Sequence, residues 1–180
     1  MRLLLHTCCA PCLTYSAKVF TEEYEEVTAL WFNPNIHPFK EYEKRFNSLK
    51  EYDDNTETDI DIIYLDNYDL KRFLKGALEA DPRCRFCYDL RLGKTAEIAA
   101  EKGFEHFSTT LTISPYQDHE LIKEVGNEVA EKHNVEFIYK DLRSGFSKHH
   151  KMANEMGLYK QSYCGCIFSE KDRYHKEINE

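Results

Sequence analysis

The chain opens with MRLLLHTCCAPC, residues 1–12, an apolar run that passes directly into three cysteines. The leucines predict a short buried strand, and Pro11 is typical of the first turn of a helix. We therefore expect Cys8, Cys9 and Cys12 between the carboxyl end of a strand and the start of a helix. Open α/β sheets bind their ligands at such strand ends, and the helix dipole there favours thiolates.

Apolar runs of strand length recur along the chain, separated by segments with helical spacing. Further strands are predicted at residues 27–32, 60–65, 104–111 and 135–139. Phe39, Tyr42, Phe46 and Leu49 are spaced 3, 4 and 3 residues apart, which predicts an amphipathic helix after the second strand. This alternation implies a Rossmann-like α/β fold, with a mostly parallel sheet of about five strands flanked by helices. We expect residues 1–180 to form a single catalytic domain.

Composition narrows the class of protein. Hydrophobic residues make up 42% of the chain and charged residues 31%, as in an ordinary soluble domain. No segment resembles a signal peptide or is long enough to cross a bilayer, so we expect a cytoplasmic protein whose thiols stay reduced. The net charge of −8 argues against a general nucleic-acid binder, but it leaves room for one RNA loop on a local basic patch.

The cysteines fall into three groups, and none stands alone: Cys8, Cys9 and Cys12; Cys84 and Cys87; Cys164 and Cys166. Grouped thiols in three distant stretches suggest one site. A four-thiolate centre could use one or both of Cys8 and Cys9 with Cys84 and Cys87, because C-x-x-C pairs serve zinc and iron–sulfur centres alike. Seven cysteines exceed the needs of one zinc, so the surplus favours redox chemistry. The alternative is that some of them, Cys12 above all, are buried core residues.

Cys164-Gly165-Cys166 differs from the other two groups. Two thiols so close in sequence can form only a small, strained ring, and a strained disulfide is easily reduced. The spacing therefore favours a redox-active pair, and metal ligation by the two sulfurs is the alternative.

Two polar residues outside the cysteine groups are candidate site residues. His37 lies in a constrained Asn-Pro loop at a strand end, where it could orient a substrate or donate a proton; a purely structural turn is the alternative. Asp141 could ligate a metal or act as an acid, or it could form an exposed ion pair with Arg143. The strand-to-helix turns carry no glycine-rich phosphate loop, so nucleotide binding in the usual manner is not expected.

Five stretches carry a family resemblance: HTCCAPC at residues 6–12, NPNIHP at 33–38, RCRFCYDLRL at 83–92, TTLTISPY at 109–116 and YKQSYCGCIFS at 159–169. Together they resemble the QueH-type epoxyqueuosine reductases, and the match is collinear over nearly the whole chain. This family completes the hypermodified base queuosine in tRNA without cobalamin.

The resemblance implies a fold like that of the adenine-nucleotide α-hydrolases and reduction of epoxyqueuosine to queuosine in the tRNA anticodon loop. It places a [4Fe-4S] cluster on Cys8, Cys9, Cys84 and Cys87, and a redox-active pair on the two C-terminal cysteines. It also implies an additional mononuclear iron, with Cys12, Asp141 or other cysteines as ligands. An external electron donor is expected; NAD, cobalamin and a membrane are not.

These implications lead to a mechanistic hypothesis: an iron polarises the epoxide oxygen, electrons arrive through the cluster, and the Cys164/Cys166 dithiol or His37 supplies protons. Three rival functions remain open from the sequence. They are a thiol–disulfide oxidoreductase acting on proteins, a non-catalytic zinc-stabilised binding module, and a tRNA-thiolating ATP enzyme, which the absent phosphate loop disfavours.

Overall fold

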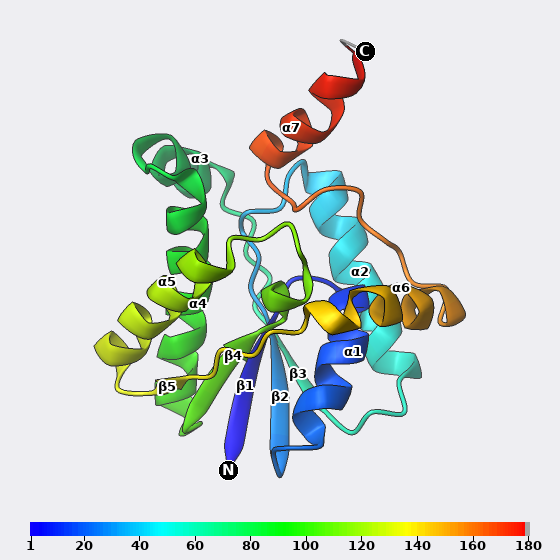
Figure 1. Cartoon of the computed structure of the whole chain (residues 1–180), viewed down its shortest axis with the longest axis vertical. Helices are drawn as coiled ribbons and strands as arrows, with labels where there is room; N and C mark the ends of the chain where they lie inside the picture. Colours follow the sequence, from blue (N-terminus) through cyan, green and yellow to red (C-terminus); the bar gives the residue numbers. More distant parts are fainter. Residues whose placement is uncertain (179–180) are drawn as a thin grey trace.

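A computed structural model describes residues 1–178 and has a five-stranded parallel sheet at its centre (Figure 1). The strands are β1 (Arg2–Thr7), β2 (Glu26–Trp31), β3 (Asp61–Tyr64), β4 (His106–Thr109) and β5 (Glu136–Phe137). Their order is β3-β2-β1-β4-β5, and each neighbouring pair is parallel. The predicted Rossmann-like parallel sheet is confirmed.

The central strand β1 is apolar because helices cover both faces of the sheet. Leu3, Leu4 and Leu5 are completely buried, as expected for a strand enclosed on two sides. The chain runs from β1 outward through β2 to β3 and then returns to β4 and β5 on the other side of β1. The carboxyl ends of β1 and β4 therefore flank the point where the strand order reverses, which is the usual ligand-binding crevice of such sheets.

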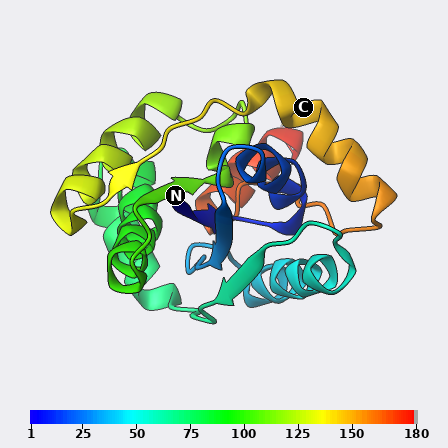
Figure 2. The ribbon, with the colours of Figure 1, turned by 90° about the horizontal axis from the view of Figure 1, so that it is seen from below.

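The helices form a layer on each face of the sheet. They are α1 (Ala10–Thr21), α2 (Phe39–Asn55), α3 (Leu70–Glu79), α4 (Arg83–Lys102), α5 (His119–His133), α6 (Phe146–Glu155) and α7 (Ile167–Ile178). Seen from below, α4 and α5 lie on one side, and α1, α2 and α6 lie on the other (Figure 2). None of the helices within the described part of the chain has the length and apolar character needed to cross a lipid bilayer.

Two predicted strands are shorter than expected. The strand predicted at residues 104–111 ends at Thr109, and a 3-10 helix, η1 (Thr110–Ile113), follows it. The Thr109 hydroxyl accepts a hydrogen bond from the backbone N–H of Leu111, which turns the chain out of the sheet at that point. The strand predicted at 135–139 is reduced to Glu136–Phe137, at the sheet edge beyond β4.

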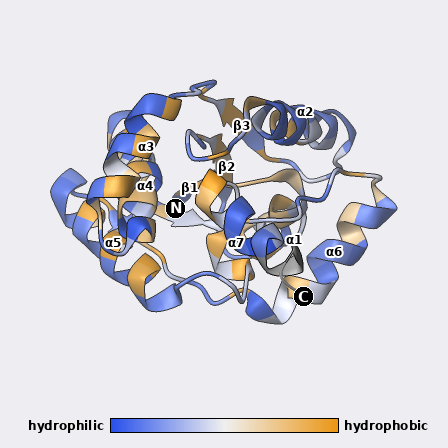
Figure 3. Cartoon of the chain, turned by 90° about the horizontal axis from the view of Figure 1, so that it is seen from above, coloured by the Kyte–Doolittle hydropathy of each residue, from blue (hydrophilic) through white to orange (hydrophobic). Residues whose placement is uncertain are grey.

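The C-terminal segment crosses the carboxyl edge of the sheet. Residues 156–166 run from α6 to α7, and α7 rises above the strand ends in Figure 1. Viewed from above, α7 lies inside the ring of the other helices (Figure 3). This path brings the last cysteine group over the edge that carries the first.

Candidate metal and redox site

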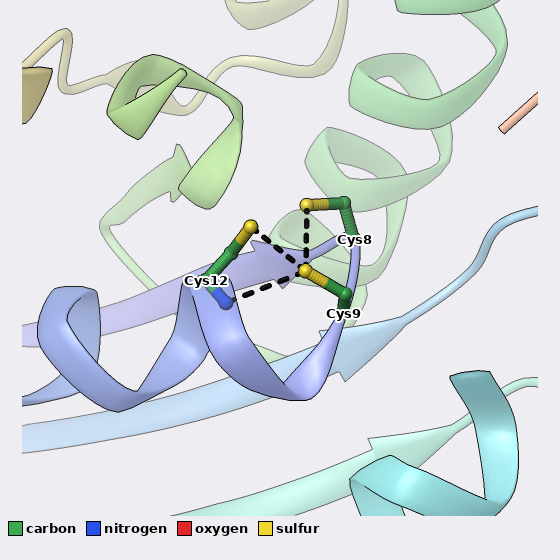
Figure 4. A group of neighbouring side chains, drawn as sticks. All are labelled: Cys8, Cys9 and Cys12. Atoms are coloured by element: carbon green, nitrogen blue, oxygen red, sulfur yellow. Dashed lines mark hydrogen bonds between the residues drawn. The ribbon is translucent and has the colours of Figure 1, made fainter. Parts of the chain in front are cut away.

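Three cysteines of the β1–α1 turn form a compact buried group (Figure 4). The Sγ atoms of Cys8, Cys9 and Cys12 all lie within 4.8 Å of one another. The Cys9 and Cys12 sulfurs are 2.7 Å apart, and those of Cys8 and Cys9 are 3.7 Å apart. Cys9 is the N-cap of α1, and its sulfur accepts a hydrogen bond of 3.3 Å from the backbone N–H of Cys12. The helix start predicted from Pro11 thus aims three soft ligand atoms at one point.

The group is chemically asymmetric. Hydrogen bonding with Cys12, then with Cys9, holds the pKa of Cys8 well below its usual range, and the Thr110 hydroxyl contributes a further bond of 3.4 Å. Burial raises the pKa of Cys9, whereas hydrogen bonding with the Cys8 and Cys9 sulfurs raises that of Cys12. Of the three cysteines, Cys8 is therefore the one whose surroundings favour the thiolate form, and a cation bound here would displace the thiol protons of the group.

The second cysteine pair lies on the first turn of α4. Cys84 is half-buried and Cys87 is buried. Burial raises the pKa of both thiols, that of Cys87 to about 12, and the nearby Cys164 raises them further. The predicted i, i+3 placement on one helix face is borne out. Both sulfurs lie near enough to Cys164 and Cys166 to be affected by their charge.

Hydrogen bonds hold the third cysteine group over the site. The Arg45 guanidinium, on α2, donates to the carbonyl oxygens of Tyr163 and Cys164 at 2.9 and 2.8 Å. The backbone N–H of His37 donates to the Gly165 carbonyl at 2.8 Å. Cys164 is exposed and accepts a bond of 3.3 Å from the Gln117 amide. The loop is therefore fixed by backbone contacts while its first sulfur stays accessible.

The same C-terminal segment reaches the first cysteine group. The side-chain amide of Gln161 donates to the Cys9 sulfur at 3.0 Å. The structure thus brings all three cysteine groups to one edge of the sheet. Cys8, Cys9 and Cys12 make the tightest set, and Cys84 and Cys87 lie beside the C-terminal pair.

His37 is buried in an aromatic pocket. Its ring centroid is 5.0 Å from that of Phe73 and 5.9 Å from that of Tyr68. Burial lowers the pKa of His37 to about 4, so the ring is neutral near pH 7. Its backbone, rather than its ring, contacts the C-terminal cysteine loop.

Asp141 forms the exposed ion pair that was the alternative to a metal-site role. Its carboxylate accepts hydrogen bonds from the guanidinium and then from the backbone N–H of Arg143, and these bonds hold the Asp141 pKa well below its usual range. Within residues 1–178, its described hydrogen bonds all go to Arg143.

Comparison with known proteins identifies the family. Residues 3–172 match the model of the family described as epoxyqueuosine reductase QueH. The chain belongs to the QueH family. A QueH from Dehalococcoides mccartyi is 39% identical over 176 residues, covering 97% of this chain and 96% of the relative. A QueH from Thermotoga maritima is 32% identical, with coverages of 98% and 95%, and one from Staphylococcus epidermidis is 34% identical, with coverages of 93% and 76%.

The chain also aligns with a solved structure. It is described as a predicted subunit of tRNA methyltransferase from Methanocaldococcus jannaschii, and it aligns with a TM-score of 0.48 at 16% identity. The alignment covers 100% of this chain and 89% of that one.

The sequence interpretation missed several residues that contact the cysteines of this QueH-family chain. Arg45, Gln117 and Gln161 touch the cysteine loops from distant elements, and no local pattern marks them. Arg91 could have been found, because it lies four residues after Cys87 and next to Leu92 on the buried side of a predicted helix. An arginine at such a position is unusual enough to suggest a role.

Proposed function

We propose that this chain reduces the epoxide of epoxyqueuosine in the tRNA anticodon loop to the alkene of queuosine, using an iron–sulfur cluster and redox-active cysteines. The observation that carries the proposal is the meeting of three cysteine groups, two of them largely buried, at the ligand-binding edge of a QueH-family fold. The reaction belongs in the cytoplasm, where thiols stay reduced.

The donor chemistry suits an iron–sulfur centre. Thiolates are the ligands of such clusters, and the compact buried group of three cysteine sulfurs is a site that a soft cation can complete. We assign Cys8, Cys9, Cys84 and Cys87 as the residues that would hold a [4Fe-4S] cluster. Cys12, 2.7 Å from the Cys9 sulfur, is the residue best placed to help hold an additional iron. The bound cluster would supply one-electron transfer.

The C-terminal dithiol is the part of this chain suited to a two-electron step. Removing the epoxide oxygen as water requires two electrons and two protons. Oxidation of the Cys164/Cys166 dithiol to a disulfide releases two electrons and two protons. An external donor must then reduce the disulfide again. Exposure of Cys164 gives a substrate or a donor access to its sulfur.

The structure favours the dithiol over His37 as the proton source. With a pKa of about 4, the His37 ring carries no spare proton near pH 7. Its backbone bond to Gly165 instead supports a role in holding the cysteine loop.

Substrate binding must be local, since the net charge of −8 opposes a broad contact with RNA. Tyr116 is 85% exposed, and it directly precedes Gln117, which contacts the Cys164 sulfur. An aromatic ring in this position is suited to stacking on an unpaired base at the site entrance. Binding should therefore be modest and salt-sensitive.

The test is an anaerobic assay on tRNA that carries epoxyqueuosine, with an artificial reductant. The wild-type chain should form queuosine, and the double variant C164S/C166S should lose multiple turnover. The variant S162A, in the same loop, serves as the matched control and should keep turnover. Full turnover by C164S/C166S would remove the dithiol from the cycle, whereas metal-independent reduction of protein disulfides without any queuosine would favour a thiol–disulfide oxidoreductase.

A further inference from the structure

Arg91 is a buried arginine without an acidic partner in the described part of the chain. Its side chain lies on α4 and is 1% exposed. One guanidinium nitrogen, Nη1, is 3.4 Å from the Oδ1 atom of Asn33. The Nε and Nη2 atoms have no hydrogen-bond partner within the described residues, and no carboxylate there forms an ion pair with the guanidinium.

Arg45 shows what a satisfied buried arginine looks like in the same protein. It is equally buried, pairs with Glu41 at 2.7 Å and donates to two backbone carbonyls. Burying an unpaired charge is strongly unfavourable, so buried arginines are normally partnered in this way. No carboxylate of the described residues balances the charge of Arg91 in this way, so an anion of another kind is needed.

The cysteine sulfurs that act on Arg91 come from all three cysteine groups. Burial acts to lower the pKa of Arg91, but Cys87, Cys164 and Cys8 act to raise it, and the net shift is upward. Cys87 precedes Arg91 by one helical turn on α4. The guanidinium is thus a fixed positive charge at the point where the three groups meet.

The position of Arg91 is set through β1. The side-chain amide of its partner Asn33 donates a hydrogen bond of 2.8 Å to the carbonyl of Thr7. Thr7 is the residue immediately before Cys8. The contact ties the cysteine-bearing helix α4 to the cysteine-bearing β1–α1 turn.

We propose that Arg91 is the fixed countercharge of the sulfur centre, a positioning residue that stabilises its anionic form and sets its reduction potential. The inference rests on the proposed function, because the centre in question is the cluster held by the assigned cysteines. Four thiolates give such a cluster a net negative charge, and one-electron reduction adds one more negative charge. A buried positive charge favours the reduced state, since net charge is one of the factors that set cluster potentials.

The test compares the midpoint potentials of reconstituted wild type, R91K and R91M in an EPR-monitored redox titration. R91K keeps the charge, and R91M keeps much of the volume without it. The control is R85M on the same helix, where Arg85 forms exposed ion pairs with Glu124 and Glu128. Circular dichroism and a thermal melt of the metal-free proteins establish that each variant folds; R91Q replaces R91M if R91M does not.

We expect the uncharged variant either to lose bound iron and sulfide or to favour the oxidised cluster by at least tenfold, a negative shift of about 59 mV for a one-electron couple. R91K and R85M should retain the cluster with midpoints close to that of wild type. The proposal is overturned if the uncharged variant holds full iron and sulfide at an unchanged midpoint, or if folded R91K loses the cluster as completely as folded R91M or R91Q. A wild-type chain that binds no cluster at all would instead defeat the proposed function.

Discussion

Replacing Arg45 tests how the C-terminal cysteine loop is held. In R45M, Glu41 loses its partner at 2.7 Å, and the carbonyls of Tyr163 and Cys164 lose donors at 2.9 and 2.8 Å. Removing one member of a buried ion pair costs about 3–5 kcal/mol, because the remaining charge stays buried. Losing the two hydrogen bonds to these carbonyls adds less to this cost than the sum of their separate energies, because a released loop can turn the carbonyls toward water. We expect R45M to lower the free energy of unfolding by about 3–5 kcal/mol.

Urea unfolding of the reduced, metal-free protein measures this change, and alkylation kinetics report the loop itself. Cys166, half-buried in the wild type, should react faster in R45M. K40M provides the control on the same helix, because the exposed Lys40–Glu43 pair at 3.2 Å contributes at most about 1 kcal/mol. An R45M variant no less stable than K40M, with unchanged alkylation of Cys166, would refute the assignment of Arg45 as the residue that holds the loop.

Three further predictions concern the loop, the buried histidine and the substrate surface. Gly165 has a φ of 153°, and the Cβ atom of G165A would lie 3.2 Å from both the Asn35 amide nitrogen and the Ile36 side chain. Urea unfolding should therefore show a free energy of unfolding lower by about 1–3 kcal/mol. The control is G93A, whose Cβ would lie 3.7 Å from a neighbouring side chain and should cost no stability. Because the folded-state pKa of His37 is about 4, below its ordinary value of 6.5, the unfolded chain binds this proton first as the pH falls. As the pH falls from 6.5 to 4, the wild type should lose up to about 3 kcal/mol of stability through this group, and H37L should not show this loss. Equal pH profiles of stability for the two proteins would contradict the assignment. Y116A should weaken binding of the tRNA anticodon loop by about 1–3 kcal/mol at fixed salt while Y116F binds like wild type; equal affinities for Y116A and wild type would exclude stacking on this ring.

The fold could be predicted because its main features are local. Fully buried parallel strands are continuous apolar runs, and the leucines before Cys8 show this clearly. Helix spacing and Pro11 then locate the helix start that brings Cys8, Cys9 and Cys12 together. The strand ends were less predictable, because the turn after Thr109 depends on a side-chain hydrogen bond to Leu111 rather than on hydrophobic pattern.

The site could be predicted only as a list of cysteines. Their grouping indicated one centre, and the structure brings the groups to one edge. The contacts that organise them come from residues far apart in sequence, such as Gln161 on Cys9 and Arg45 on the Cys164 carbonyl. The state of a buried charge also depends on all of its neighbours. Only the folded chain reveals that no carboxylate of the described residues pairs with Arg91.

The central claim is that the cysteines hold an iron–sulfur cluster. It is tested most directly by the absorption spectrum and the iron and sulfide content of protein purified without oxygen. The account predicts brown protein with several irons and matching sulfide, lost when Cys8 or Cys87 is replaced by serine. Colourless protein with one zinc, even after attempted cluster reconstitution, would contradict it and favour a zinc-stabilised binding module.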